Sequence, residues 1–285
     1  MIHTRLLAVG CAAACLPGLA APVAAHAATS PAIRASVRGR PGGDGTVNFT
    51  LTNTNPLGGL PAPMLGPLVV DLPRGLRIAT SGFPMCTYAT LAAGPAGCPA
   101  GSRVGTGSAE IAADLAGAPF SERATMAVYV TGLDPLRLLF WTHGTSPVEE
   151  TIIASAALSS ARGSFGNALT VDVPAIPTVP GASNASIVSL STTFSASRRV
   201  RVTTRVRTRV HGRRITRVTR RTKTIDAITL PRTCTSRTMP WAATGAYADG
   251  TQATARTTSA CPAPVRHARI RRTRLRAGHH RSRRS

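Results

Sequence analysis

Alternation of apolar and polar residues is the feature that most limits how this chain can fold. Four stretches show it, at residues 45–53 (GTVNFTLTN), 124–132 (ATMAVYVTG), 169–173 (LTVDV) and 187–197 (IVSLSTTFSAS). A period of two residues is typical of strands with one buried face, because successive side chains of a strand point to opposite faces. Clusters of Pro and Gly separate the stretches and interrupt any helical period. We therefore expect an all-β fold, an immunoglobulin-like β-sandwich of ten or more short strands.

We expect this sandwich to occupy residues 28–262. Residues 72–74 and 230–232 both read Leu-Pro-Arg, and each triplet is followed by two cysteines, the second of which is in a Cys-Pro pair. One interpretation is a duplication, with halves at 28–118 and 119–262. The alternative is chance, because such short motifs arise easily in a chain rich in Ala, Pro and Arg.

The N-terminus has the features of a secretory signal peptide, residues 1–27. It has a basic start, an apolar stretch from Leu6 to about Ala25, and the small-x-small sequence Ala25-His26-Ala27. The apolar stretch is too short and too interrupted to favour a membrane anchor, and too little of it precedes Cys11 for a lipoprotein signal. We expect a secreted, extracellular or cell-envelope protein with no membrane span in the mature chain.

Export has a consequence for the cysteines. The mature chain keeps four, and an even number in an oxidising compartment predicts disulfides. Three pairings are possible, and neighbour pairing is the simplest: Cys86 with Cys98 around a loop with a short helical turn, and Cys234 with Cys261 around a hairpin. A zinc site needs Cys-x-x-Cys spacing or nearby histidines, and neither is present, so we expect no metal and no cofactor.

The net charge of +23 is concentrated in two segments, because 21 of the 34 basic residues lie in residues 198–223 and 265–285. The second segment belongs to a C-terminal tail, residues 263–285. This tail has few large apolar residues and nine arginines, so we expect it to be disordered.

The first segment predicts a protruding basic β-hairpin within residues 198–230. In residues 199–210, valine or threonine at every even position alternates with a residue, mostly arginine, at every odd position. His211-Gly212 fits a hairpin tip. We expect Thr216, Val218 and Thr222 to join the valine face of the returning strand, with arginine opposite arginine on the other face. The predicted basic face consists of Arg199, Arg201, Arg205, Arg207, Arg209, Arg217, Arg221 and Lys223.

Two interpretations of this face remain open. Like charges directly opposed on paired strands destabilise a sheet, and packing of the apolar face on the sandwich, salt, or a bound polyanion would offset that cost. The first interpretation is therefore a polyanion-binding site. The second is a solvated edge whose charges prevent aggregation.

The usual catalytic motifs are missing from the sequence: it has no Gly-x-Ser-x-Gly elbow, Ser-x-x-Lys, His-Glu-x-x-His or Walker loop. His143 with Glu149 and Glu150 is the one cluster of imidazole and acid in the body. One interpretation is a hydrolase site, in which His143 is the general base and a carboxylate orients it. The alternative is a purely structural one, a strand end followed by a loop. We predict no catalytic residue and no enzyme.

Residues 70–111, together with the segment around Cys234 and Cys261, resemble a group of secreted β-sandwich proteins of high-GC actinobacteria that have no known activity. The shared features are a Leu-Pro-x-Gly strand end, a first Cys, a Leu-containing turn, Cys-Pro and a Ser-x-Val-Gly-x-Gly strand. Here they fall on Leu72, Gly75, Cys86, Leu91, Cys98, Pro99, Ser102, Val104, Gly105 and Gly107. The resemblance covers about a third of the chain and implies export and β-sandwich modules, without an activity to carry over.

The sequence favours a non-enzymatic secreted protein that attaches loosely to anionic surface polymers through its basic hairpin and tail. The first alternative is an extracellular nucleic-acid binder without sequence preference, because the hairpin lacks the aromatic residues that stack on bases. The second alternative is a secreted hydrolase that uses His143.

Overall fold

The computed structural model describes residues 29–115, 118–146, 149–176, 185–210, 213–234 and 236–262. The predicted signal peptide, residues 1–27, and the predicted disordered tail, residues 263–285, lie outside them. The elements are β1 (Ser30–Gly39), β2 (Gly45–Thr54), β3 (Met64–Pro73), β4 (Arg77–Ile78), α1 (Tyr88–Ala92), the 3-10 helix η1 (Pro95–Gly97), β5 (Arg103–Leu115), β6 (Ala118–Leu133), β7 (Leu136–Gly144), β8 (Glu150–Ser160), β9 (Phe165–Val173), β10 (Ser186–Phe194), β11 (Ser197–Val210), β12 (Arg213–Asp226), β13 (Ile228–Thr229), β14 (Thr238–Tyr247) and β15 (Gln252–Ala260).

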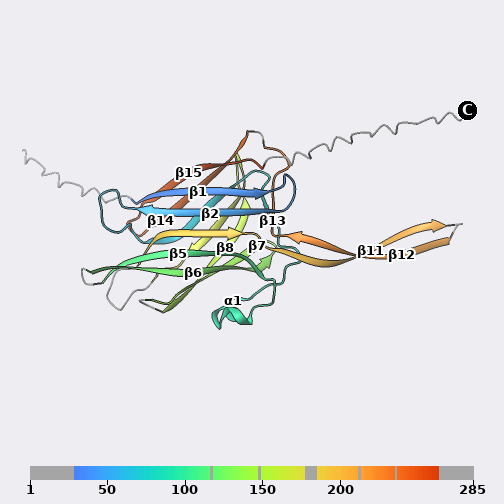
Figure 1. Ribbon diagram of the computed structural model, residues 1–285, viewed down its shortest axis with the longest axis horizontal. Helices are drawn as coiled ribbons and strands as arrows, with labels where there is room; N and C mark the ends of the chain where they lie inside the picture. The colour runs from blue at the N-terminus through green and yellow to red at the C-terminus, as the bar shows by residue number, and fades with distance from the viewer. Residues whose placement is uncertain are drawn as a thin grey trace, which may run out of the picture.

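Most strands belong to one antiparallel sheet of 11 strands, in the order β1-β2-β10-β5-β6-β7-β8-β9-β3-β14-β15. The edge strands β1 and β15 lie side by side, so the sheet curls until it is nearly closed (Figure 1). The all-β prediction is confirmed. The immunoglobulin-like sandwich is not, because the strands form one continuous hydrogen-bonded sheet instead of two. Several strands are also long instead of short, β6 with 16 residues being an example.

The predicted boundary near residue 118 falls at the first residue of β6, which pairs with β5. Strands from the two sides of this boundary also alternate in the sheet, since β10 lies between β2 and β5, and β3 lies between β9 and β14. The segments 28–118 and 119–262 therefore share one sheet and one core.

The core lies inside the curled sheet, and the alternation predicted from sequence produces it. In β2 every second residue is buried, beginning with Val47 and Phe49. Phe49 meets Trp241 of β14 with ring centroids 6.5 Å apart, and the Trp241 indole N–H donates to the Ser259 hydroxyl at 2.9 Å. Leu138 of β7 is fully buried in the same cluster. Residues far apart in sequence therefore stabilise each other through one hydrophobic core.

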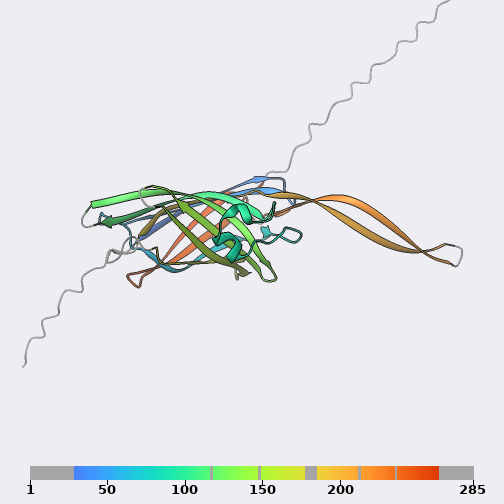
Figure 2. The same cartoon turned by 90° about the horizontal axis from the view of Figure 1, so that it is seen from below.

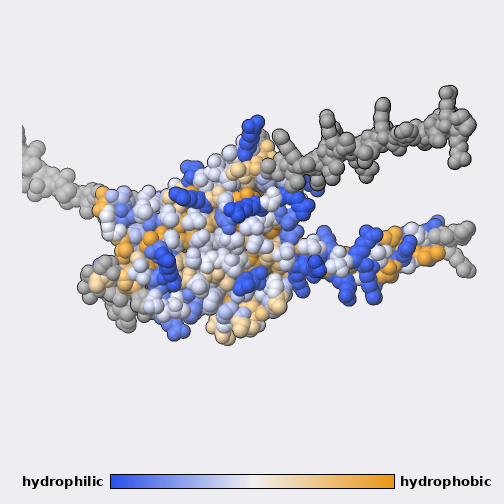
Figure 3. Space-filling view, in the orientation of Figure 1, coloured by the Kyte–Doolittle hydropathy of each residue, from blue (hydrophilic) through white to orange (hydrophobic). Residues whose placement is uncertain are grey.

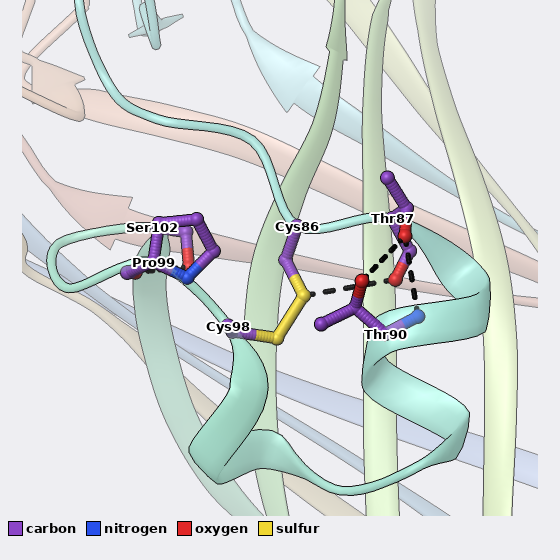
Figure 4. The surroundings of a disulfide bond; sticks show 6 residues. All are labelled: Cys86, Thr87, Thr90, Cys98, Pro99 and Ser102. Carbon is purple, nitrogen blue, oxygen red and sulfur yellow. Dashed lines mark hydrogen bonds between the residues drawn. A yellow bond between two sulfur atoms is a disulfide. The ribbon is translucent and has the colours of Figure 1, made fainter.

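The predicted disulfide between Cys86 and Cys98 is confirmed, and it closes a helical loop against the outside of the sheet (Figure 4). The Thr87 hydroxyl caps α1 by accepting from the Thr90 backbone N–H at 3.2 Å. Leu91 is fully buried in a second hydrophobic cluster with Tyr129 of β6 and Leu139 of β7. The loop acts as a small cap that α1 and the disulfide hold in place.

The predicted disulfide between Cys234 and Cys261 is confirmed as well. It joins the two ends of the hairpin that β14 and β15 form, next to a backbone hydrogen bond from Cys261 N–H to the Arg237 carbonyl at 2.9 Å. Two such disulfides fit an extracellular protein. Among the described residues, no helix has the length and apolar character needed to cross a membrane.

Candidate functional site

The predicted basic hairpin exists as a two-stranded ribbon of its own. β11 and β12 have 14 residues each and pair only with one another. The ribbon projects away from the body in both views (Figures 1 and 2), and at about 3.3 Å per residue it has a length of about 45 Å. Residues 211–212, the predicted tip, lie outside the described residues, and the register pairs Val210 with Arg213 on either side of them.

The predicted assignment of the β12 residues to the two faces of the ribbon is wrong, whereas the assignment of the β11 residues is confirmed. Residues directly opposite each other in an antiparallel pair have their side chains on the same face. The register pairs each odd-numbered residue of β11 with an even-numbered residue of β12. Arg217, Arg221 and Lys223 are odd-numbered residues of β12, so they lie opposite valines. Thr216, Val218 and Thr222 lie opposite arginines instead.

One face of the ribbon, which we call the arginine face, carries seven arginines. Five come from β11 as predicted, and β12 adds two that the sequence analysis did not assign to it. The seven residues are Arg199, Arg201, Arg205, Arg207, Arg209, Arg214 and Arg220. The opposite face, the mixed face, interleaves cations with apolar residues: Arg198, Val200, Val202, Val206, Ile215, Arg217, Arg221 and Lys223. Both faces are therefore basic.

The predicted opposition of arginine to arginine is also wrong for most of the ribbon. Of the pairs that the structure describes between β11 and β12, only Arg209 with Arg214 brings two cations directly opposite. Arg201 faces Thr222, and Arg205 faces Val218. Repulsion therefore acts mainly along each strand, where arginines two residues apart are separated by about 7 Å. At that distance two charges repel by only about 0.6 kcal/mol in water.

The apolar side chains of the outer ribbon do not pack on the body, contrary to one of our expectations. Val202, Val206, Ile215 and Val218 are between 40% and 51% exposed. All eight predicted site residues are exposed too, and strongly hydrophilic residues cover much of the ribbon in Figure 3, with hydrophobic residues between them. Packing on the body therefore does not hold the outer ribbon in place.

Within the described part of the ribbon, the contacts with the body lie at its base. Ile225 packs against the main core, and the Arg198 guanidinium donates to the Gly82 carbonyl. Directly after β12, Ala227 is fully buried and its backbone N–H donates to the Ala196 carbonyl at 2.8 Å. The ribbon is thus a solvated arm on a fixed base.

The cluster at His143 is not assembled as a catalytic pair. Nδ1 of His143 lies 2.9 Å from the Thr151 hydroxyl, and its ring stacks on Trp141 at 5.3 Å between centroids. The partner of the imidazole on the neighbouring strand is therefore a hydroxyl, and not the carboxylate of Glu149 or Glu150. Among the described residues there is no group of three or more His, Cys, Asp or Glu that could hold a metal ion.

No family model matches the chain, and neither a search of curated proteins nor a search of solved structures found a match. The resemblance to secreted actinobacterial proteins stays a prediction.

Proposed function

We propose that this chain is a secreted, non-enzymatic protein that binds anionic polymers through the β11–β12 ribbon. The observation that carries the proposal is the arginine face, with seven exposed guanidinium groups on an arm that extends away from the body. Residues 197–225 contain no Asp or Glu to neutralise these charges. A polymer with regularly spaced anions would do so, and would gain free energy from the release of its counterions.

Attachment through the ribbon should show no preference for a particular polymer sequence. Arginine binds phosphate and carboxylate groups through two parallel N–H donors, and this contact does not depend on what else the polymer carries. Because the arm is long and exposed on both faces, it can contact several repeat units of a flexible polymer at once. Salt weakens each single contact, so the affinity depends on how many contacts form at once.

A second candidate, a nucleic-acid binder, is favoured by the shape of the ribbon. The major groove of duplex DNA accepts a two-stranded β-ribbon, and both faces of this ribbon carry cations that would meet the two groove walls. The ribbon has no aromatic residue for stacking on unpaired bases. Base stacking would therefore contribute nothing, and binding to duplex DNA would depend mainly on contacts between these cations and the phosphates.

The test removes four charges from the arginine face: Arg201, Arg205, Arg207 and Arg209 are changed to Thr, which keeps strand propensity. A matched control removes four exposed arginines of the body, Arg34, Arg38, Arg103 and Arg137. Affinity for heparin and for duplex DNA is measured against salt. The ribbon variant should lose affinity at low salt, and on DNA the slope of log affinity against log salt should flatten by about three to four units.

Because the basic tail would bind polyanions on its own, the comparison is repeated in a chain that ends at Ala263. An unchanged slope there, or an equal change in the body control, would leave the ribbon as a solvated edge that limits aggregation. If DNA binds at least tenfold more tightly than a flexible polyanion of equal charge, the nucleic-acid candidate replaces the first.

A further inference from the structure

A cleft of about 760 Å³ lies at the base of the ribbon and is separate from it. It opens where β3 ends, beside the short sheet of β4 and β13, and β13 follows β12 after a single residue. Its volume is within the range of about 300 to 1,000 Å³ that is common for ligand sites. Three arginines line it: Arg74, Arg77 and Arg232.

The cleft brings together the two Leu-Pro-Arg triplets that the sequence analysis noted as a repeat. Residues of both triplets line it, and the segments touch, since a Cβ added to Gly75 would lie 2.9 Å from Cβ of Pro231. The backbone N–H of Gly42 donates to the Pro231 carbonyl at 3.1 Å. Arg74 and Arg232, 158 positions apart in the chain, therefore line one site.

Contacts with the backbone hold two of these arginines in place. Nη2 of Arg74 donates to the Gly163 carbonyl at 2.6 Å. The aliphatic stem of Arg232 covers Gly42, where an added Cβ would lie 2.5 Å from Cγ of the arginine. Arg77 extends from β4, which pairs with β13. An arginine anchored through its stem or one of its nitrogens loses less freedom when it binds an anion.

No Asp or Glu is among the described residues that line the cleft. The carboxylate of Asp44, which lies in the adjoining turn, is 3.7 Å from a nitrogen of Arg40. Three exposed arginines therefore line the cleft with no lining carboxylate to balance them. An anion supplied from solution would balance their charge.

The rest of the wall indicates what the anion is attached to. Five residues that carry hydroxyl groups line the cleft beside the arginines: Ser164, Thr229, Thr233, Ser236 and Thr238. The Ser236 hydroxyl donates to the Thr238 carbonyl at 2.7 Å. The floor consists of buried side chains, with Leu230 1% and Met239 2% exposed. A bare phosphate would fill only a small part of this volume, and the hydroxyls offer both donors and acceptors to a hydroxyl-rich ligand.

We propose that this cleft binds a phosphate ester of a sugar or other polyol. The arginines hold the phosphate oxygens, and the Ser and Thr hydroxyls bind the hydroxyl groups of the polyol. The ribbon would bind any polymer of sufficient negative charge, whereas the cleft would bind one polyol phosphate group. The inference does not rest on the ribbon, because a small phosphate ester is too short to reach from the cleft along the arm.

The experiment titrates the full chain by calorimetry with glycerol 1-phosphate, the phosphodiester glycerophosphoglycerol, inorganic phosphate and glycerol. The first two probes separate a free phosphate monoester from the phosphodiester unit of a polymer. At least one of them should bind at 50 mM salt, more tightly than inorganic phosphate, and glycerol should not bind. Changing Arg74, Arg77 and Arg232 together to Ser should weaken binding at least tenfold.

Two controls are matched to this variant. Changing Arg34, Arg38 and Arg137 to Ser removes the same charge from the outside of the body, and the four-arginine ribbon variant removes charge from the arm; neither should change the dissociation constant of the small ester by more than twofold. Thr233→Glu adds a negative charge at an exposed position of the cleft. It should also weaken binding tenfold, and it serves if the triple variant does not fold.

The proposal is overturned if neither ester binds more tightly than inorganic phosphate. It is also overturned if the body control weakens binding as much as the cleft variants do. The polymer titrations of the ribbon are unaffected by either result, so failure of the cleft and failure of the ribbon are distinguishable.

Discussion

The β11–β12 ribbon and the strands of the main sheet have the same alternating sequence pattern and opposite environments. In β2, alternate residues are buried and form the core. In β11, Val202 and Val206 alternate just as regularly, yet both are exposed. The difference shows that a period of two predicts a strand but does not predict a buried face, because burial requires a second surface to cover it. In the described outer part of the ribbon no such surface covers Val202 and Val206, and the neighbouring arginines keep them solvated.

The largest expected effect comes from shortening matched side chains in the two regions. Leu138→Ala, at a fully buried position, should lower the free energy of unfolding by about 2 to 5 kcal/mol, since it leaves a cavity in the core. Val206→Ala, on the exposed mixed face, should change it by less than about 0.5 kcal/mol. Denaturant unfolding measures both. A loss above 1 kcal/mol for the valine variant would mean that the ribbon packs on something in solution.

The disulfide of the cap gives the next effect. Cys86→Ser combined with Cys98→Ser opens a loop with a sequence separation of 12 residues, and should lower the free energy of unfolding by about 3 kcal/mol. The salt dependence of polymer binding should stay the same, because the ribbon carries no cross-link.

Thiol titration of the unfolded, unreduced mature chain should find no reactive cysteine among the four. Two reactive thiols would contradict one of the bridges.

A buried tyrosine of the body, Tyr247, should make the stability of the protein depend on pH. Burial, with a smaller contribution from Asp249, raises the pKa of Tyr247 to about 12 from its ordinary value of 10, and its hydroxyl donates to Oδ1 of Asn53 at 3.0 Å. A raised pKa in the folded state means that stability is fully present below about pH 10 and is lost as the pH rises through about 12. Up to about 2.7 kcal/mol should be lost over that window.

Tyr247→Phe provides the control for this pH dependence. It should cost about 1 kcal/mol at neutral pH, since the Asn53 oxygen loses its donor, and it should remove the added loss between pH 10 and 12. Urea unfolding at several pH values measures both quantities. An unchanged alkaline slope in this variant would assign the loss to another group.

Local patterns predicted much of this molecule from particular residues. Alternation located the strands around Phe49 and Leu169, and the valine and arginine alternation located the ribbon. The cysteine spacing and the expectation of an oxidising compartment predicted both disulfides. The arrangement of these strands was not predictable in the same way, because the placement of β10 between β2 and β5 depends on contacts between residues far apart in sequence.

The candidate sites show the same limit. The sequence pattern predicted eight cations on one face of the ribbon, and the predicted face is wrong for Arg217, Arg221 and Lys223. A signal was available, since a two-residue tip at 211–212 pairs odd-numbered with even-numbered residues. For the cleft, the signal was the repeated Leu-Pro-Arg triplets. Duplication or chance explains the repeat in the sequence, and the structure adds that residues of both triplets line one cleft.

The sequence alone determined the strand-forming segments, the cysteine pairing and the concentration of charge, because each depends on neighbours within a few tens of residues. The tertiary structure decided which alternating faces became core, since burial depends on what the curled sheet encloses. It also decided that Arg74 and Arg232 would share one cleft. The two arginines come together only because the end of β3 lies beside the segment after β13. A local sequence pattern cannot predict a contact between residues so far apart in the chain.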